Sequence, residues 1–372
     1  MGCGDAPVRL INAPPLSVGL IGCGYAAEIH LDALRALPHA KVVGVADIDE
    51  SARRAITGRN GALQAFTDYR ALLEHPGIDA VAILTPPYLH LEMTAAALDA
   101  GKHVMVEKPI TRDLAEADRL IELAGRSAKK IIVGYNLRFH RQLQEARRRI
   151  RAGALGQVEF LRGVASSTYQ FGRRFPEYRR RRDLGGGVLI ELAVHHFDLW
   201  RYLLEDEVVE IVATSHAKNG EDTTATVTAR MASGVLVTSA FSEHAAEQHE
   251  IEIYGDRGRI RASIYRFDGF ALVPTGVYEG HPVRRVRRFV EALGEVPPAL
   301  RAARQGGVFL ESFRSLWQHF ADAIRNDTAV APDLEDGRRS LQVALAAVHS
   351  ADSGRVVRVA DAPRTVAAQH PA

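Results

Sequence analysis

Three side chains that could exchange a proton with a substrate stand in one short stretch, directly after three glycines. Glu191, His195 and Asp198 follow glycines 185–187 and are spaced by four and three residues. The apolar period of this stretch predicts a helix, and on one helix these three side chains share a face. A histidine flanked by carboxylates could act as a general base at neutral pH, while the acids orient it or bind substrate hydroxyls. The glycines would let a ligand approach the backbone closely.

Other interpretations of this stretch stay open. His195 could instead hydrogen-bond across a domain junction from a buried helix and take no part in chemistry. His196 also competes for the role, but it points about 100° away from His195 on an ideal helix, so only one of them can lie on the acidic stripe. A metal site of Glu191, His195 and Asp198 has no supporting motif, and we predict no bound metal.

A second candidate for chemistry is Lys108, which follows a predicted strand over residues 103–106 and precedes Pro109. The carboxyl ends of parallel strands form the edge at which open α/β sheets bind ligands. A lysine at that edge could stabilise a developing negative charge. The alternative is a surface lysine before a turn.

The element that must position these groups is a strand–turn–helix–strand unit over residues 16–47. An apolar run through Ile21 leads directly into Gly22-Cys23-Gly24-Tyr25-Ala26-Ala27, a G-x-G-x-x-A turn. Gly22 allows the tight turn, Gly24 leaves room for a pyrophosphate, and Ala27 lets the helix pack closely on the strand. The phosphates would then bind at the helix N-terminus. The pattern predicts a dinucleotide-binding Rossmann unit, and the alternative is a tight turn without a ligand.

Asp47 ends the second strand of this unit, where a carboxylate can accept hydrogen bonds from both ribose hydroxyls. Such a carboxylate repels a 2′-phosphate, so we predict NAD rather than NADP. Arg53 and Arg54 keep NADP open, because a nearby arginine can accommodate that phosphate. The predicted cofactor-binding residues are Gly22, Gly24, Tyr25, Ala26, Ala27, Asp47, Thr85, Pro86, His90, Glu107 and Lys108.

Length and charge limit the class of protein. The chain has 372 residues, which predicts roughly two domains of ordinary size. Its 47 basic and 45 acidic side chains nearly cancel, which argues against binding nucleic acid or a membrane surface. The two cysteines, Cys3 and Cys23, cannot supply a disulfide framework or a cysteine-based zinc site. The N-terminal residues lack an apolar signal core, and we predict a cytoplasmic protein.

Alternating strands and helices continue to about Tyr135, which predicts a parallel sheet in a first domain over residues 1–135. The second half, residues 136–372, carries strands in succession with helices beside them. This order is typical of an α+β domain with an antiparallel sheet. Residues 265–307 mix Gly, Pro and Arg and match neither pattern.

Several motifs together resemble the Gfo/Idh/MocA oxidoreductases. They are GLIGCGYAAEIH, VVGVADID, AVAILTPPYLHLEMTAAALDAGKHVMVEKPI, GGGVLIELAVHHFDLWRYL and IEIYGDRGRI. The resemblance implies a Rossmann domain and a second domain whose large open sheet commonly forms homodimers or homotetramers. It also implies NAD or NADP, an active-site role for Lys108 and proton transfer by His195. One position departs from the family pattern, because Glu191 stands where Asp is usual.

These residues predict hydride transfer between a nicotinamide and a secondary alcohol or ketone, with His195 as acid and base. Lys108 would stabilise the alkoxide, and Glu191 would hold a hydroxyl or orient His195. By resemblance the substrate is a sugar, a sugar derivative or a cyclitol. The alternatives are an NAD-dependent glycosidase without net redox change and a dinucleotide-binding sensor without turnover. The arginines between Arg173 and Arg182 could bind an anionic substrate, or could form a solvated loop or a subunit contact.

Overall fold

The computed structural model describes residues 14–365, apart from 60, 62, 169–175, 218–221, 267–268 and most of 278–305. The first half forms a six-stranded parallel sheet with the order β3-β2-β1-β4-β5-β6. The predicted parallel sheet is confirmed, and the strand predicted at 103–106 has those bounds. Its strands are β1 (Leu16–Ile21), β2 (Ala40–Ala46), β3 (Gln64–Phe66), β4 (Ala80–Ile83), β5 (His103–Val106) and β6 (Ile131–Val133).

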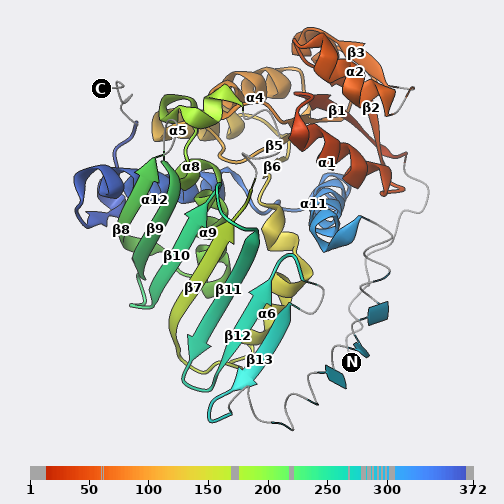
Figure 1. Cartoon of the computed structure of the whole chain (residues 1–372). Helices are drawn as coiled ribbons and strands as arrows, with labels where there is room; N and C mark the ends of the chain where they lie inside the picture. Colours follow the sequence, from red (N-terminus) through yellow and green to blue (C-terminus); the bar gives the residue numbers. More distant parts are fainter. Residues whose placement is uncertain are drawn as a thin grey trace, which may run out of the picture.

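Helices cover both faces of this sheet (Figure 1). Alternate residues of β4 show why, because Ala80 and Ala82 face one hydrophobic core and Val81 and Ile83 face the other. Because β4 is buried on both faces, its sequence is a continuous apolar run, as is usual for parallel strands. The helices of this half are α1 (Tyr25–Arg35), α2 (Glu50–Gly58), α3 (Tyr69–Leu73), α4 (His90–Asp99) and α5 (Leu114–Ala124).

The second half forms an eight-stranded sheet with the order β13-β12-β11-β7-β10-β9-β8-β14. Its pairs are antiparallel except β7 with β10, so the predicted mostly antiparallel sheet is also confirmed. The strands are β7 (Val158–Ser166), β8 (Val208–Ala217), β9 (Asp222–Met231), β10 (Leu236–Ser242), β11 (Gln248–Gly255), β12 (Gly258–Ser263), β13 (Phe270–Pro274) and β14 (Val357–Arg358). β13 lies in the part of the chain that the sequence left unassigned.

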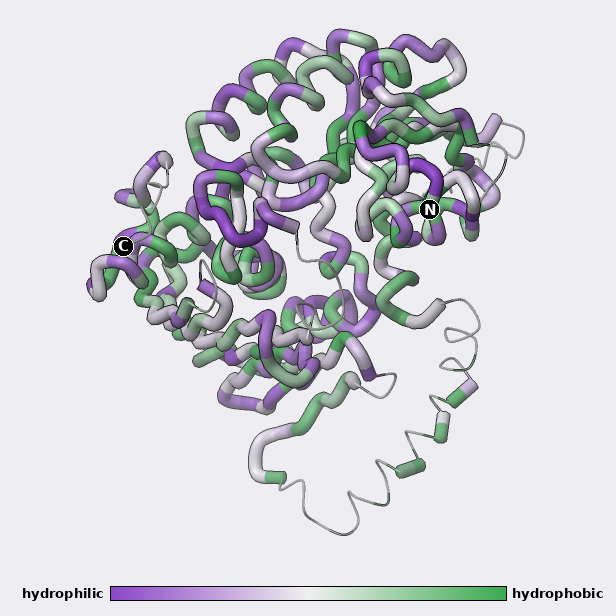
Figure 2. Tube along the Cα trace, turned by 45° about the horizontal axis from the view of Figure 1, so that its top comes forward, coloured by the Kyte–Doolittle hydropathy of each residue, from purple (hydrophilic) through white to green (hydrophobic). Residues whose placement is uncertain are grey.

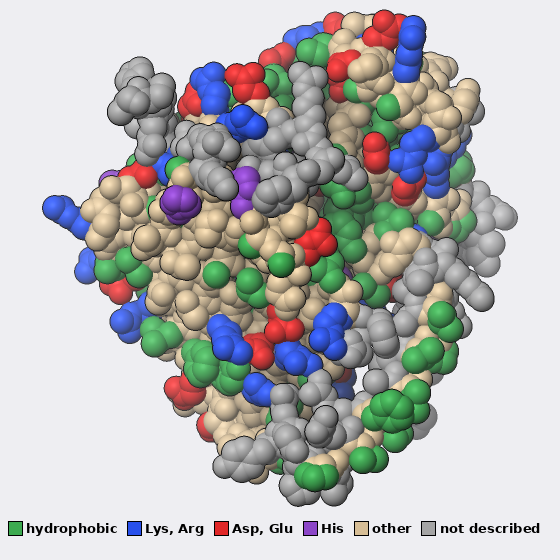
Figure 3. All heavy atoms as spheres, viewed as in Figure 1, with side chains coloured by type: hydrophobic (Ala, Val, Ile, Leu, Met, Phe, Trp, Pro, Cys, Tyr) green, Lys and Arg blue, Asp and Glu red, His purple; other side chains and the backbone are tan. Residues whose placement is uncertain are grey.

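The helices α6, α9 and α12 lie behind this sheet in Figure 1, and no helix among the described residues covers its other face. Figure 3 looks onto that face, where hydrophobic side chains lie among charged ones. Phe160 is 40% exposed and Leu236, its neighbour on β10, is 49% exposed, while the Phe160 ring stacks on Tyr254 of β11 with 4.3 Å between centroids. The helices of this half are α6 (Arg141–Arg151), α8 (Val188–Glu191), α9 (Ala193–Leu204), α11 (Gly307–Asn326) and α12 (Leu334–Ser353).

The late helix α11 returns to the first sheet. It packs beside α1, and Leu316 and Trp317 are fully buried in the same core as Val18 and Leu20 of β1. Figure 2 shows hydrophobic stretches alternating with hydrophilic ones along the helices around the sheets, as expected of helices with one buried face. The predicted division at residue 135 stays a prediction, but α11 packs in space with the first sheet.

The predicted helix after the glycines is interrupted. α8 ends at Glu191, α9 begins at Ala193, and Leu192 between them has φ −98° and ψ −49°. The assumption of one continuous helix through Glu191, His195 and Asp198 is therefore wrong.

Candidate active site

The glycine turn after β1 has the shape needed to hold a dinucleotide. Gly22 has φ +95°, and a Cβ there would lie 2.9 Å from the carbonyl of Leu84. A Cβ on Gly24 would meet nothing within 4 Å, so open space lies where a pyrophosphate would approach. Gly24 is also the N-cap of α1 and supplies no side-chain acceptor to the first turn. Ala27 is fully buried against the core, as predicted for close packing of helix and strand.

Asp47 is held at this turn by two backbone groups. Its carboxylate accepts from the N–H of Cys23 at 2.7 Å and from the N–H of Asp49 at 2.9 Å. Of the two arginines that left NADP open, Arg53 donates to the backbone carbonyl of Asp47 and so lies beside this turn, whereas Arg54 forms an exposed pair with Glu50. The negative charge of Asp47 thus lies beside the phosphate-binding turn, where the NAD prediction needs it.

At the carboxyl edge, His90 connects the loops after β4 and β5. One ring nitrogen contacts the carbonyl of Thr85 at 2.8 Å and the other contacts the carbonyl of Pro109 at 2.9 Å. The side chain is fully buried. Both ring nitrogens hold the loops that carry Thr85, Pro86 and Lys108, and the place of His90 in the cofactor site stays a prediction.

Glu107 is fixed by a chain of hydrogen bonds that starts on α11. The indole N–H of Trp317 donates to Nδ1 of His30 at 2.9 Å, and Nε2 of His30 lies 3.0 Å from Oε1 of Glu107. Because an indole only donates, Nδ1 must accept, and the proton on Nε2 is directed at the carboxylate. The other Glu107 oxygen accepts from the N–H of Lys108. Burial raises the pKa of Glu107, but the His30 bond and the Lys108 charge outweigh burial and keep it below its usual value.

Lys108 and Glu191 meet across the two halves of the chain. The Lys108 ammonium lies 2.9 Å from Oε2 of Glu191 and 3.0 Å from the Glu191 carbonyl oxygen. The two side chains are 11% and 4% exposed. Burial raises the pKa of the Glu191 carboxyl, but the charges of Arg179 and Lys108 outweigh burial and lower the pKa to about 2. Glu191 is therefore ionised at neutral pH and forms a buried ion pair with Lys108.

Three further residues, Tyr178, Arg179 and Glu243, belong to this cluster. Arg179 lies between Oε2 of Glu191, at 3.4 Å, and Oε1 of Glu243, at 3.2 Å. Tyr178 also hydrogen-bonds to Glu191. Arg179 belongs to the arginine-rich stretch that the sequence singled out, but Glu243, which follows β10, carried no sequence signal.

His195 is the histidine that is accessible from the site. It is partly exposed, and its ring lies edge-on to that of Tyr135, with 6.3 Å between the ring centroids. Its Nδ1 has no hydrogen-bond partner in the described part of the chain. Burial lowers the pKa of His195 well below its usual value, and the Lys108 charge lowers it further. His196 is fully buried against the sheet, where its Nε2 lies 2.9 Å from Nε2 of His249. Of the two histidines, His195 is therefore the one that is partly exposed and whose pKa responds to the Lys108 charge, and it is neutral at pH 7.

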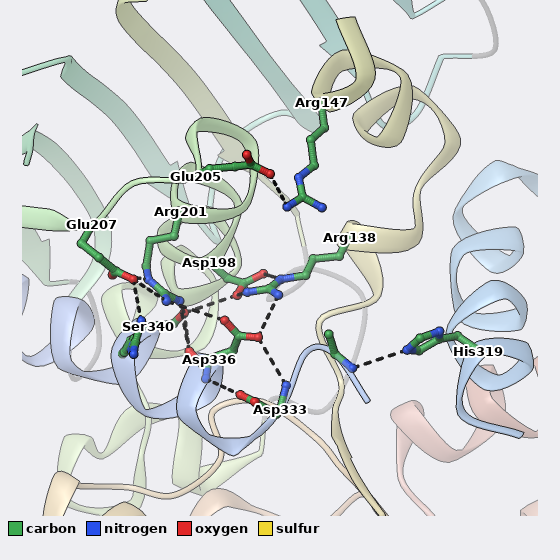
Figure 4. Close-up of polar contacts among 12 residues, drawn as sticks. Arg138, Arg147, Asp198, Arg201, Glu205, Glu207, His319, Asp333, Asp336 and Ser340 are labelled. Carbon is green, nitrogen blue, oxygen red and sulfur yellow. Dashed lines mark hydrogen bonds and ion pairs between the residues drawn. The ribbon is translucent and has the colours of Figure 1, made fainter. Parts of the chain in front are cut away.

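Asp198 does not lie with Glu191 and His195. It is 1% exposed and accepts two hydrogen bonds from Arg138, at 2.6 and 2.8 Å, and Arg138 also pairs with Asp336 of α12 (Figure 4). The predicted acidic stripe is therefore wrong. The break at Leu192 separates Glu191, which faces Lys108, from Asp198, which joins α9 to the segment after β6.

The three glycines make room for protein rather than ligand in this structure. A Cβ on Gly186 would lie 2.2 Å from the carbonyl oxygen of Tyr178, and one on Gly185 would lie 2.8 Å from the Pro87 ring. The N–H of Gly187 donates to the Arg179 carbonyl at 3.0 Å. The predicted approach of ligand to these glycines is replaced by the approach of the segment that carries Arg179.

Within the arginine-rich stretch, Arg182 is buried and pairs with Asp222 and Asp352, while Arg181 pairs with Asp183. The contacts of Arg182 thus lie within the chain, whereas Arg180 and Arg181 are exposed, as expected for a solvated loop. Arg173 and Arg174, like Cys3, lie outside the described residues.

The described residues contain no group of three or more metal-ligating side chains arranged to hold an ion. None of their helices is both long and apolar enough to cross a bilayer.

The parallel sheet carries a glycine turn suited to a dinucleotide, and a lysine, a carboxylate and a neutral histidine lie at its carboxyl edge. This combination is typical of nucleotide-dependent oxidoreductases. Residues 16–135 match the family described as "Oxidoreductase family, NAD-binding Rossmann fold", and residues 143–261 match the GFO/IDH/MocA C-terminal domain. The chain belongs to the Gfo/Idh/MocA oxidoreductase family. The predicted resemblance, the enzyme class and the NAD-binding fold are confirmed.

Relatives match almost the whole chain. A myo-inositol 2-dehydrogenase of Thermotoga maritima is 27% identical, with 92% of this chain and 98% of the relative covered. A 1,5-anhydro-D-fructose reductase of Ensifer adhaerens is 29% identical with the same coverage. Among solved structures, a levoglucosan dehydrogenase in complex with NADH and L-sorbose superposes with a TM-score of 0.77 at 23% identity, covering 93% of this chain and 99% of that one. A Bordetella pertussis dehydrogenase in complex with NADH and UDP-GlcNAcA reaches 0.79 at 20% identity, covering 94% and 99%. At these identities the structural likenesses establish the fold.

Proposed function

We propose that this chain is an NAD-dependent oxidoreductase that transfers hydride between the nicotinamide and a secondary alcohol or ketone of a sugar, a sugar derivative or a cyclitol. The observation that carries the proposal is the neutral His195 beside the Lys108–Glu191 ion pair, at the carboxyl edge of the dinucleotide-binding sheet. A proton acceptor and a fixed cation at the edge where open α/β sheets bind ligands support this proposal.

The chain's own residues fit the cofactor. The open space at Gly24 and the N-terminus of α1 would receive the pyrophosphate, and the Asp47 carboxylate would accept from the ribose hydroxyls. A 2′-phosphate would meet the Asp47 charge, which supports NAD over NADP. Thr85, Pro86 and Glu107 would line the nicotinamide end. Bound NAD supplies the hydride acceptor.

The proton is handled by His195. Because burial and the Lys108 charge keep its pKa low, His195 is neutral at pH 7 and can accept the proton of the substrate hydroxyl. Lys108 would donate to the same oxygen and stabilise the negative charge that develops there. Glu191 holds the Lys108 ammonium in place through its carboxylate and its backbone carbonyl. In the direction of reduction, His195 must first be protonated before it donates to the substrate oxygen, so its low pKa favours that direction only at lower pH.

The substrate class is supported by the relatives, which are named as inositol and anhydrofructose enzymes and are matched over almost their whole length.

We also propose a homodimer or homotetramer formed through the uncovered face of the second sheet, where Phe160 and Leu236 are exposed. Light scattering of the parent chain and of Phe160→Asp tests this, since a charge in a sheet interface is expected to yield monomers.

The deciding experiment measures nicotinamide absorbance at about 340 nm over a panel of sugars and cyclitols. Net NADH formation with one member, lost in Lys108→Met while NAD binding persists, is the expected result. Glycoside cleavage without net NADH would support the redox-neutral alternative. Normal NAD binding without turnover across the panel would support a sensor.

A further inference from the structure

Arg179 lies between two buried carboxylates at the edge of the candidate active site. Its two terminal nitrogens are 3.4 Å from Glu191 and 3.2 Å from Glu243, whose side chains are 4% and 5% exposed. The Arg179 side chain is 19% exposed. Glu191 has a closer partner in Lys108, at 2.9 Å, so Glu243 is the carboxylate that balances Arg179.

The position of Arg179 is built into the fold. Its backbone carbonyl accepts from the N–H of Gly187, and the carbonyl of Arg181 accepts from the N–H of Gly186. Any side chain at Gly186 would collide with the Tyr178 and Arg179 backbone. The backbone N–H of Glu243 in turn donates to the carbonyl of Thr223 on β9. Arg179 and Glu243 are therefore fixed to the same framework that holds Glu191.

We propose that Glu243 sets the charge preference of the substrate site by neutralising Arg179, so that the site takes an uncharged sugar or cyclitol and discriminates against one that carries a carboxylate. This inference rests on the proposed function. A substrate carboxylate could bind Arg179 only by displacing Glu243, which would leave a buried charge without its partner, or by lying beside two negative charges.

The distances indicate that Arg179 interacts with the two carboxylates mainly through charge, without a short hydrogen bond to either. Both of its carboxylate contacts are longer than the roughly 2.7–2.9 Å typical of charge-assisted hydrogen bonds. When the charge of Glu243 is removed, the main chain at Arg179 keeps its hydrogen bond to Gly187 and the cluster gains one net positive charge, which favours an anionic ligand. Arg179 could therefore bind an anionic ligand, and the charge of Glu243 prevents that binding.

The test uses sugar pairs that differ only in a CH₂OH or a carboxylate, namely glucose with glucuronate and galactose with galacturonate. Binding to the NADH-saturated chain is measured by calorimetry, and kcat/KM by NADH formation. The parent chain is expected to favour the neutral member of each pair. Glu243→Gln, which keeps the shape and removes the charge, is expected to shift the ratio toward the uronate by about 10-fold or more. Adding Arg179→Gln to that variant is expected to abolish the gain.

Glu207→Gln serves as the matched control, because Glu207 also pairs with an arginine, Arg201, but lies beyond the C-terminal end of α9. It should leave the ratio unchanged. A parent chain that favours the uronates overturns the inference without any variant. So does a folded Glu243→Gln chain with normal NADH binding and an unchanged ratio. If instead no sugar or cyclitol binds to the parent chain or is oxidised by it, the proposed function itself fails. This outcome differs from a failure of the charge-preference inference, in which neutral substrates still bind and react.

Discussion

Replacing Glu191 with Gln tests whether the centre of the site is a buried ion pair. The substitution keeps the length of the side chain and removes only its charge. In the parent chain, Oε2 of Glu191 lies 2.9 Å from the Lys108 ammonium and 3.4 Å from Arg179. A Gln at this position cannot attract the two cations, and its amide nitrogen cannot accept a hydrogen bond from them.

The magnitude follows from the pKa of Glu191, which falls from 4.5 to about 2 on folding. One pKa unit corresponds to about 1.4 kcal/mol, so the native environment favours the ionised form by roughly 3 kcal/mol at pH 7. Because the folded pKa is the lower one, this contribution is complete above pH 4.5 and is lost as pH falls toward 2. At pH 3.5 it should be roughly 2 kcal/mol.

The assay is urea unfolding followed by the fluorescence of the buried Trp200 and Trp317, at several pH values between 7 and 3.5. The free energy of unfolding of Glu191→Gln is expected to lie roughly 3 kcal/mol below that of the parent at pH 7, with a smaller gap at pH 3.5. The difference between the two chains cancels the titration of all other groups. Glu122→Gln removes an exposed carboxylate that pairs with Arg119 and should leave the unfolding curve unchanged. Equal stabilities at pH 7, or a gap independent of pH, would refute the ion pair.

Glu191→Asp tests reach at constant charge. The shorter carboxylate moves away from Lys108 by about one methylene, and misplacing a positioning group by about 1 Å can cost up to 10²-fold in rate. We expect normal NAD binding and a loss of about 10-fold or more in kcat/KM on the best substrate of the panel. Parent-like kcat/KM in this variant and in Glu191→Gln would make Glu191 a purely structural residue.

Three further outcomes are expected. Asp47→Ala should shift the ratio of NAD to NADP affinities toward NADP, as measured by fluorescence titration, because one repulsive charge is removed; equal affinities in the parent chain would contradict this. His195→Ala should lower kcat by about 10² to 10⁴ with NAD binding intact, whereas His196→Ala should affect mainly stability; the reverse result would exchange their roles. Arg138→Ala leaves the Asp198 carboxylate buried without its main partner, so urea unfolding should report a loss of about 3–5 kcal/mol; a loss below about 1 kcal/mol would mean that water reaches this site.

The first half of the fold was predictable because its signals are local. The run through Ile21, the glycine turn and Asp47 lie within one strand–helix–strand unit, and each residue is explained by its immediate neighbours. Asp68 caps α3 as its position before YRALL predicts. The carboxyl ends of adjacent parallel strands must meet, which is why Lys108 could be placed at the ligand edge before the structure was known.

The site itself was only partly predictable, because its contacts join distant segments. Lys108 and Glu191 are 83 residues apart, and Trp317 is 287 residues from the histidine to which it donates. Hydrophobic periodicity reports which residues of a helix are buried, but it does not report a break of one residue. The run around Leu192 keeps its apolar period through α8 and α9, so the pattern could not separate Glu191 from Asp198.

The break at Leu192 explains how one stretch serves two purposes. On a continuous helix Glu191 and Asp198 would lie on one face, roughly 10 Å apart along the axis. Ending α8 at Glu191 directs that carboxylate to Lys108, while α9 directs Asp198 to Arg138 and so ties the helix to the rest of the chain. His195, in the first turn of α9, has no carboxylate hydrogen-bond partner among the described residues, and burial together with the charges of Lys108 and Arg179 lowers its pKa. The interruption therefore converts a predicted histidine–carboxylate pair into a neutral histidine beside a separate lysine–carboxylate pair, which is the arrangement that the proposed proton transfer requires.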